Sequence, residues 1–469
     1  MSAVQHGTYG SDGEPRLASL RVAQVNTSDV GGGAEKVALA MHREYSKRNC
    51  QAWLLVGRKC FQNPNVLTLS SITYSYFARP SARIGNLLSP FVGKVPGMGL
   101  LRSCSRWIAQ PRSLLEVQRG HEDFDFPETW RLLDLLPERP DIVHCHNLHG
   151  GYFDLRALPW LTHQVPVILT LHDCWLLSGH CAHSFSCERW KTGCGECPDL
   201  TIYPGIRRDA TAFNWHRKRE IYARSHFYVA TPSRWLMRRV EQSMIAPSIA
   251  ESRVIPNGTD LTVFKPGARK PAREILGIPQ DRRTLLFVGN RTRTNIWRDF
   301  ATLEKAISRV ATRLTDENLL LICLGEKGKM RTIGRADIWF VGYARAAATV
   351  AKYYQAADVY VHPARADTFP STVLEALACG IPVVASAIGG IPEQVKSLGT
   401  YDEDDATGLL VPPGNQEAMA EAMLALLTNT RLRRRLGNNA ARDARERFDL
   451  GRQVDDYLKW YSEIVDRRD

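Results

Sequence analysis

The feature that most constrains the fold is the order of segments in residues 19–56. Residues 19–25 (SLRVAQV) form a short apolar run, and residues 26–33 end in three glycines. Apolar side chains recur at helical spacing over residues 34–47, and a second apolar run follows at residues 52–56. Strand, glycine-rich turn, helix and strand in this order are typical of the βαβ unit of a doubly wound sheet. Further strands are predicted at residues 141–144, 165–171 and 227–230.

The second half of the chain repeats this alternation. Strands are predicted at residues 284–288, 318–324, 338–340, 359–362 and 382–385. Helices are predicted at residues 300–314, 346–357, 372–379, 416–427 and 432–447. Two separate blocks of alternating strands and helices indicate two α/β domains.

The boundary between the domains is predicted near residues 257–266 (NGTDLTVFKP), where Asn-Gly, Asp and Pro cluster as they do in turns and linkers. We therefore expect a first domain at residues 16–258 and a second domain at residues 259–448. Residues 449–469 form a last helix with an apolar face at helical spacing. We expect this helix to return to the first domain.

Composition excludes several classes of protein. The chain has 469 residues with 44% hydrophobic and 23% charged side chains, as in soluble globular proteins. No apolar run reaches the roughly 18 residues of a membrane span, and the polar residues 1–15 lack the apolar core of a secretory signal. A cytoplasmic protein with reduced cysteines is expected. The net charge of +12 indicates an anionic partner, but no nucleic-acid-binding motif accompanies it.

Residues 77–117 form a basic insertion in the first domain. Glu116 is the only acid among six basic residues, and apolar side chains lie between them. One interpretation is an irregular segment packed on the first domain. The other is an interfacial segment that places the protein at the inner face of a membrane through anionic lipid.

The most specific motif is residues 367–380 (DTFPSTVLEALACG), which follow a predicted strand and open a helix. Asp367 lies on the loop, and Glu375 lies one turn into the helix, eight positions later. The helix begins near Ser371, so its free amides form an anion site beside the two carboxylates. Carboxylates can accept hydrogen bonds from sugar hydroxyls. The alternative is an ordinary helix cap with a surface glutamate.

This motif resembles the acidic motif of the retaining GT-B glycosyltransferases of family 4, in which two glutamates bracket seven residues. The resemblance implies two doubly wound, Rossmann-like domains that face a cleft. By position, Glu375 matches the ribose ligand, and Asp367 stands where the first glutamate holds the donor sugar. Pro370 replaces the usual glycine and lacks an N–H. The resemblance therefore implies amide contacts from Phe369, Ser371, Thr372 and Val373.

The loop that opens the second domain resembles the phosphate clamp of the same family. Gly289 ends the strand, and Arg298 stands where a lysine is usual. Arginine supplies a fixed positive charge and a fork that fits a phosphate. Arg291 and Arg293 both remain candidates for the second clamp position. Tyr343 lies where the loop that binds the nucleotide base begins in the family.

The first domain carries matching strand-end features. Gly32 and Gly33 resemble the glycine loop that approaches the donor diphosphate and the acceptor, although a simple tight turn would look the same. His172 ends a buried strand (TLHD) and matches a histidine that contacts the donor sugar in the family. Asn147 and His149 occupy another strand-end loop that could shape the acceptor pocket.

Five of the eleven cysteines fall within residues 174–197. Four of them could close a structural zinc site in a loop at residues 174–200, namely Cys181, Cys187, Cys194 and Cys197. Disulfides, a redox pair or reduced packing are the alternatives. The string around them resembles a subset of family 4 from exopolysaccharide pathways of colanic-acid type.

The resemblance implies a retaining glycosyltransferase of hexosyltransferase type. It would move a sugar from a nucleotide diphosphate sugar to a hydroxyl of a glycan or lipid-linked acceptor, in polysaccharide or glycolipid biosynthesis. Arg298 and the helix N-terminus would neutralise the leaving diphosphate, so catalysis would need no metal. A nucleotide-sugar epimerase of the same fold and an inactive sugar-nucleotide-binding subunit are the alternatives.

Overall fold

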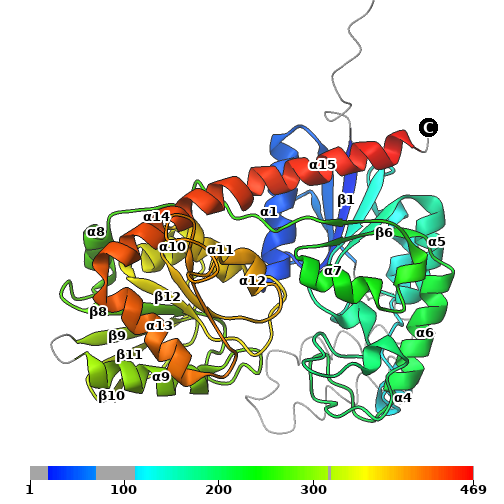
Figure 1. The fold of residues 1–469 in the computed structure, drawn as a ribbon. Helices are drawn as coiled ribbons and strands as arrows, with labels where there is room; N and C mark the ends of the chain where they lie inside the picture. Colours follow the sequence, from blue (N-terminus) through cyan, green and yellow to red (C-terminus); the bar gives the residue numbers. More distant parts are fainter. Residues whose placement is uncertain (1–19, 70–110, 315–317, 468–469) are drawn as a thin grey trace, which may run out of the picture.

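The computed structural model describes residues 20–69, 111–314 and 318–467, and their strands form two separate sheets (Figure 1). The first sheet, within the described part of the chain, is entirely parallel in the order β3-β2-β1-β4-β5-β6-β7. Its strands are β1 (Arg21–Ser28), β2 (Gln51–Arg58), β3 (Val66–Thr68), β4 (Ile142–Cys145), β5 (Val167–Thr170), β6 (Phe227–Thr231) and β7 (Ile249–Val254). The topology reverses between β1 and β4, and ligands of doubly wound sheets bind at the carboxyl ends of the strands beside such a reversal.

The second sheet has the order β10-β11-β9-β8-β12-β13-β14 and is parallel except for the pairing of β10 with β11. Its strands are β8 (Arg283–Val288), β9 (Leu319–Leu324), β10 (Arg331–Ile333), β11 (Ala336–Val341), β12 (Val359–His362), β13 (Val383–Ser386) and β14 (Gly408–Val411). All six residues of β9 are buried, as expected for a strand covered on both faces. The predicted α/β architecture with two doubly wound sheets is confirmed.

Helices pack on the faces of both sheets (Figure 1). Those of the first domain are α1 (Gly33–Lys47), α4 (Pro111–Gln118), α5 (Leu158–Gln164), α6 (Thr211–Ala223) and α7 (Arg234–Glu241). Those of the second domain are α8 (Arg269–Leu276), α9 (Phe300–Arg313), α10 (Ala347–Ala356), α11 (Ser371–Ala378), α12 (Ile391–Gln394), α13 (Gln416–Thr428) and α14 (Thr430–Arg447). Within the described ranges, no helix is long and apolar enough to cross a membrane. Most of the basic insertion predicted at residues 77–117 lies outside the described residues.

The helix α15 (Leu450–Asp466) leaves the second domain and packs on the first (Figure 1). Its apolar face completes a core with Val22 of β1, Ile142 of β4 and Ile168 of β5. The hydroxyl of Tyr461 lies 2.9 Å from the hydroxyl of Tyr45 and 2.6 Å from His144 Nδ1. The first sheet therefore obtains one of its covering layers from a helix that follows the second domain in the chain.

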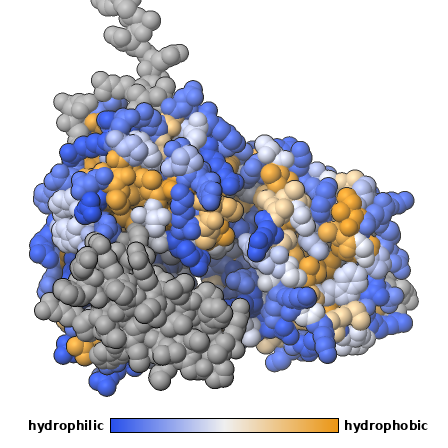
Figure 2. Space-filling view, turned by 180° about the vertical axis from the view of Figure 1, so that it is seen from behind, coloured by the Kyte–Doolittle hydropathy of each residue, from blue (hydrophilic) through white to orange (hydrophobic). Residues whose placement is uncertain are grey.

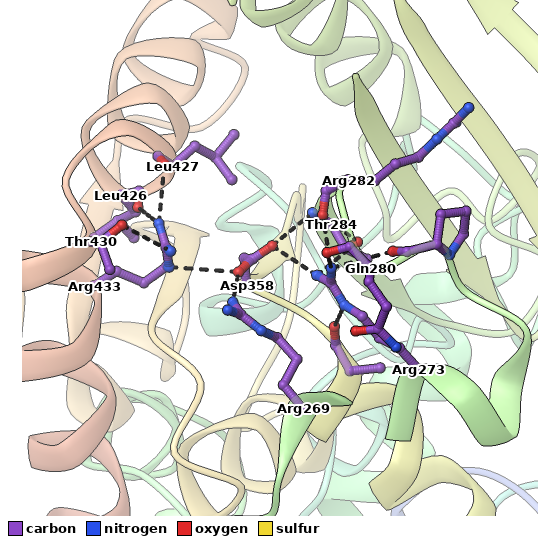
Figure 3. A network of polar contacts seen from close by, with 12 residues as sticks. Arg269, Arg273, Gln280, Arg282, Thr284, Asp358, Leu426, Leu427, Thr430 and Arg433 are labelled. Carbon is purple, nitrogen blue, oxygen red and sulfur yellow. Dashed lines mark hydrogen bonds and ion pairs between the residues drawn. The ribbon is translucent and has the colours of Figure 1, made fainter. Parts of the chain in front are cut away.

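A buried ionic cluster holds the second domain together at the amino ends of the central strands β8 and β12, opposite the cleft. Asp358 precedes β12 and is only 4% exposed. Its carboxylate pairs with Arg269 of α8, with Arg273 of the same helix over 3.0 Å, and with Arg433 of α14 over 3.6 Å (Figure 3). It also accepts a hydrogen bond from the Thr284 amide over 2.9 Å. One carboxylate thus joins two helices and two strands.

Candidate active site

A cavity of about 250 Å³ lies between the two domains, with walls from both. The first domain supplies His172, Asp173, Ala182, His183 and Tyr203, and the second supplies Trp297, Arg298, Ala366, Asp367 and Thr368. Figure 2 shows a hydrophilic hollow between the two halves of the molecule. Three of the four predicted catalytic residues meet in this cavity, namely His172, Arg298 and Asp367.

Arg298 and Asp367 form the charged centre of the cavity. Arg298 Nη1 lies 2.7 Å from Asp367 Oδ2, and the two side chains are only 16% and 14% exposed. Burial raises the pKa of Asp367, but Arg298 and His362 outweigh it and lower the pKa to about 2. The carboxylate is therefore ionised at neutral pH. Arg298 Nε is buried without a hydrogen-bond partner, and the Arg298 side chain lines the cavity.

A second histidine supports Asp367 from behind. His362 Nε2 lies 3.3 Å from Asp367 Oδ2, and His362 Nδ1 lies 2.9 Å from the Tyr360 hydroxyl. Burial lowers the pKa of His362, so the ring is neutral at neutral pH. Because an ionised carboxylate only accepts, His362 Nε2 donates to Asp367 and Nδ1 accepts from Tyr360. This chain fixes the direction of the Asp367 carboxylate.

Glu375 lies in α11 behind this cavity and is 5% exposed. The Tyr354 hydroxyl donates to Glu375 Oε2 over 2.9 Å. Burial raises the pKa of Glu375, and the charge of Lys36 from the first domain opposes that rise. Lys36 thus faces Glu375 across the cleft. Glu375, the residue predicted to bind the ribose, is thus hydrogen-bonded to Tyr354 and has the cationic Lys36 nearby.

The N-termini of α1 and α11 converge beside Glu375. A side chain at Gly33, the first residue of α1, would have its Cβ 3.9 Å from Ser371 Oγ, at the start of α11. The first amides of each helix have no partner within the helix, so both ends favour an anion. The Thr372 hydroxyl at this end is buried against Tyr360. Gly32 is the N-cap residue of α1.

The residues predicted to supply amides at the start of α11 differ in their contacts. The Val373 amide donates to the Pro370 carbonyl over 3.1 Å. Phe369 is 5% exposed and packs edge-on against Phe448 with ring centroids 6.0 Å apart. The Phe369 side chain therefore belongs to the core. Ser371 and Thr372 begin the helix and keep the predicted position.

The candidates for the second phosphate clamp lie outside the cavity walls. Arg293 Nε donates to Glu326 Oε1 over 2.6 Å, and its guanidinium lies 4.7 Å from the Phe340 ring centre. Arg291 is exposed and has a positive φ of 51°. Gly289 donates its amide to the Leu324 carbonyl over 2.9 Å. Glu326, which sequence reasoning did not consider, therefore forms an ion pair with Arg293 in this structure.

Two further predicted residues also lie outside the cavity walls. Tyr343 follows β11 and is 57% exposed. The Asn147 carbonyl accepts a hydrogen bond from the Tyr152 hydroxyl over 2.6 Å. Both lie at carboxyl ends of strands, the edge at which the cleft opens.

His172 is held by a neighbouring histidine. His172 Nε2 lies 3.0 Å from His146 Nδ1, and His146 Nε2 lies 3.2 Å from Gln24 Nε2. Burial lowers the pKa of His172 to about 4, so the imidazole is neutral at neutral pH. Its backbone carbonyl accepts a hydrogen bond from the Thr368 hydroxyl over 2.6 Å. Both its ring and its carbonyl are therefore fixed.

Sequence reasoning missed an acidic and aromatic part of the cavity. Asp173 directly follows His172, and its Oδ2 lies 2.7 Å from His149 Nε2. Tyr203 and Trp297 reach the same space from two different loops. The HD dipeptide was the one available signal for Asp173. No spacing in the sequence places Tyr203 or Trp297 in the cavity.

The four cysteines of the predicted zinc site are free thiols. Burial raises the pKa of Cys181 to about 11 and that of Cys194 to about 12. The thiol of Cys197 lies 3.4 Å from His180 Nε2. Among the residues that the structure describes, no group of three or more His, Cys, Asp or Glu is placed to hold a metal ion. The arrangement gives zinc no support, and zinc stays a prediction that metal analysis of purified protein decides.

Comparison with known proteins identifies two family models and several relatives. The model for "Glycosyl transferases group 1" matches residues 268–443, and the model for "Glycosyltransferase Family 4" matches residues 31–263. A D-inositol 3-phosphate glycosyltransferase of Paenarthrobacter aurescens is 30% identical over 346 residues, which cover 71% of this chain and 78% of that protein. A protein of Escherichia coli K12 named as the colanic acid biosynthesis glycosyl transferase WcaC is 25% identical over 58% of this chain and 66% of its own length.

The relatives and a solved structure match different shares of the chain. The chain spans about half the length of the first curated relatives it matches, 54% and 50%. The structure of Anabaena Alr3699/HepE in complex with UDP and glucose has a TM-score of 0.59 at 16% identity, covering 94% of this chain and 99% of its own. At that identity the likeness shows the fold alone. It agrees with the predicted GT-B arrangement of two Rossmann-like domains that face a cleft.

Proposed function

The chain belongs to the group 1 and family 4 glycosyltransferases, and from this membership we propose that it is a retaining hexosyltransferase. It moves a sugar from a nucleotide diphosphate sugar to an acceptor hydroxyl. The observation that carries the proposal is the meeting of His172, Arg298 and Asp367 in one interdomain cavity. The converging N-termini of α1 and α11 lie at the same cleft.

The donor nucleotide binds mainly to the second domain. Glu375, held by Tyr354, accepts hydrogen bonds from the ribose hydroxyls. The diphosphate lies where the ends of α1 and α11 meet, because backbone amides and both helix dipoles favour negative charge there. The Thr372 side chain lies at the same end of α11.

The chemistry follows from the charges in the cavity. Loss of the nucleotide diphosphate places negative charge on the leaving oxygen while the sugar becomes cationic. Arg298 stabilises that oxygen, and the ionised Asp367 and the neutral His172 contact the sugar. The acceptor hydroxyl attacks from the face that the diphosphate leaves, its proton passes to the leaving phosphate oxygen, and the anomeric configuration is retained.

The relatives suggest where to begin with substrates. WcaC is named for colanic acid biosynthesis, and HepE was solved with UDP and glucose. We therefore propose that this chain acts in polysaccharide or glycolipid biosynthesis and that UDP is the first nucleotide to try. Peripheral contact with the inner face of a membrane rests on the sequence of residues 77–117 alone.

Two measurements test the proposal. Thermal unfolding is followed with UDP and other nucleoside diphosphates, because a ligand of the native state raises the unfolding temperature. Donor turnover is then measured with and without acceptors in wild type and Arg298→Ala, which should lose at least tenfold in rate. Arg365→Ala is the matched control, since Arg365 is exposed and pairs with Asp299 outside the cavity. Epimerisation of the donor alone, or wild-type transfer by Arg298→Ala, would contradict the proposal.

A further inference from the structure

The first-domain wall of the cavity carries a cluster that the donor chemistry does not use. Asp173 Oδ2 lies 2.7 Å from His149 Nε2, and the Tyr203 hydroxyl lies 3.4 Å from His149 Nδ1. Asp173 Oδ1 accepts a hydrogen bond from the Trp175 amide over 2.9 Å. Asp173 and Tyr203 both line the cavity, and His149 stands behind them. We call Asp173, His149 and Tyr203 the acidic wall.

The charges of the acidic wall are paired with each other. Burial raises the pKa of Asp173, but His149 and the Trp175 amide lower it below its usual range. Burial lowers the pKa of His149, but Asp173 outweighs burial and raises it. The Asp173 carboxylate is thus ionised. It has about four acceptor sites and uses two of them in these contacts, so it can accept from a ligand hydroxyl.

Aromatic rings stand on two sides of the same space. Tyr203 is 50% exposed, and Trp297 enters the cavity from the second domain. Phe185 covers one face of Trp297 with ring centroids 5.2 Å apart and planes 9° apart. Flat aromatic faces beside a carboxylate suit a ligand that has both apolar C–H faces and hydroxyl groups. A pyranose ring has this combination.

We propose that the acidic wall is the acceptor subsite and that the acceptor places an unphosphorylated sugar ring there. Asp173 accepts a hydrogen bond from an acceptor hydroxyl, and Tyr203 and Trp297 contact the ring. Asp173 is a weak base because its pKa is lowered, so it orients the hydroxyl and the leaving phosphate takes the proton. This inference rests on the proposed function, since it names the acceptor of the same cleft.

The charges of the cavity oppose a phosphorylated sugar at this place. Arg298 is the one Arg or Lys among the described residues that line the cavity, and it pairs with Asp367. His149 pairs with Asp173. Among the described residues that line the cavity, a phosphate would meet two carboxylates and a single arginine that is already paired, which disfavours it relative to a neutral ring. The acidic wall therefore favours a neutral sugar ring in two ways, by contacts with the ring and by repulsion of a phosphate.

Direct binding tests the subsite without the transfer reaction. Saturation-transfer NMR on the full chain with UDP present compares methyl hexopyranosides with the matching hexose 6-phosphates. The neutral glycosides should bind more tightly than their phosphorylated counterparts. Asp173→Asn and Tyr203→Ala should each weaken glycoside binding at least tenfold, while Asp134→Asn, an exposed acid of the same domain, should leave it within twofold.

The outcomes separate this inference from the proposed function. Tighter binding of the phosphates, no glycoside binding, or unchanged binding in both cavity variants would overturn the acceptor subsite. The UDP-induced rise in unfolding temperature is recorded for every variant and should persist in Asp173→Asn and Tyr203→Ala, which also shows that they fold. Absence of that rise in the wild type tells against the proposed donor site, whereas the glycoside comparison still decides the acidic wall.

Discussion

The hydroxyl of Thr368 donates a hydrogen bond to the backbone carbonyl of His172 over 2.6 Å, and this bond joins the two domains at the walls of the cavity. A second link lies nearby, where Glu393 of α12 accepts hydrogen bonds from the Arg234 and Trp235 amides over 2.8 Å each. A side chain of the second domain thus caps α7 of the first. These contacts hold the two domains in the relative position that the structure shows.

Replacing Thr368 tests whether this contact supports catalysis. Thr368→Val keeps the shape of the side chain but removes the donor, and one neutral hydrogen bond contributes about 1 kcal/mol. We expect about a fivefold loss in kcat/KM for the donor. Thr368→Ser retains the hydroxyl and should stay near the wild-type value. Equal kinetics for the valine and wild-type enzymes would show that the contact does not matter.

Glu375→Gln tests the ribose ligand. The amide fills the same space beside Tyr354, but its NH2 group replaces one of the two oxygen acceptors. A buried hydroxyl left without its acceptor costs about 1–3 kcal/mol, so UDP affinity measured by calorimetry should fall at least about fivefold. Glu446→Gln changes an exposed glutamate of the same domain and serves as the matched control. Wild-type UDP affinity in Glu375→Gln would show that Glu375 does not bind the nucleotide.

Buried neutral histidines predict a loss of stability in mild acid. Burial lowers the pKa of His144 to about 3 and that of His146 well below its ordinary value of 6.5. Above pH 6.5 the ring is neutral in both states, and below it only the unfolded state gains the proton. Stability is therefore present above pH 6.5 and lost as the pH falls. Each histidine should remove about 1.4 kcal/mol between pH 7.5 and 5.5.

Denaturation at several pH values checks this expectation. His144→Gln removes one titrating ring while a polar side chain remains to face Tyr461 and Thr170. Its free energy of unfolding should fall less steeply than that of the wild type below pH 6.5. Parallel pH profiles for the two proteins would show that His144 is not kept neutral by the fold.

Asp358→Asn tests the ionic cluster of Figure 3. Removing the charge leaves Arg273 and Arg433 buried with no compensating carboxylate, and breaking such a pair destabilises by about 3–5 kcal/mol. The unfolding transition of the second domain should move to a lower temperature. Asp281→Asn, an exposed aspartate of the same domain, should leave the transition in place. An unchanged transition in Asp358→Asn would contradict the role given to the cluster.

Much of the fold could be predicted because parallel strands covered on both faces are continuous apolar runs, as in β9. Short edge strands such as β3 and β10 have no such run and were missed. His172, Arg298 and Asp367 meet because all three follow strands whose carboxyl ends face the cleft. The meeting of residues at the carboxyl ends of parallel strands can be predicted from the order of strands and helices alone.

Other contacts could not be predicted because they depend on packing across the chain. His149 reaches Asp173 only because β4 and β5 are neighbours in the sheet. Arg293 is a candidate clamp in the sequence, and its pairing with Glu326, from the loop after β9, depends on the packing of two loops that spacing does not predict. In the sequence, Asp358 looks like any polar residue between two elements. In the structure, three arginines from two helices surround it.

The position of α15 has a consequence for synthesis on the ribosome. The first sheet ends with β7 at Val254, but the helix that covers Val22, Ile142 and Ile168 begins only at Leu450. At roughly 5–20 residues per second, the intervening chain of about 200 residues takes roughly 10–40 s to make. During that interval the nascent first domain presents an uncovered apolar face. We expect ribosome-bound chaperones to bind this nascent chain until α15 emerges and covers the apolar face.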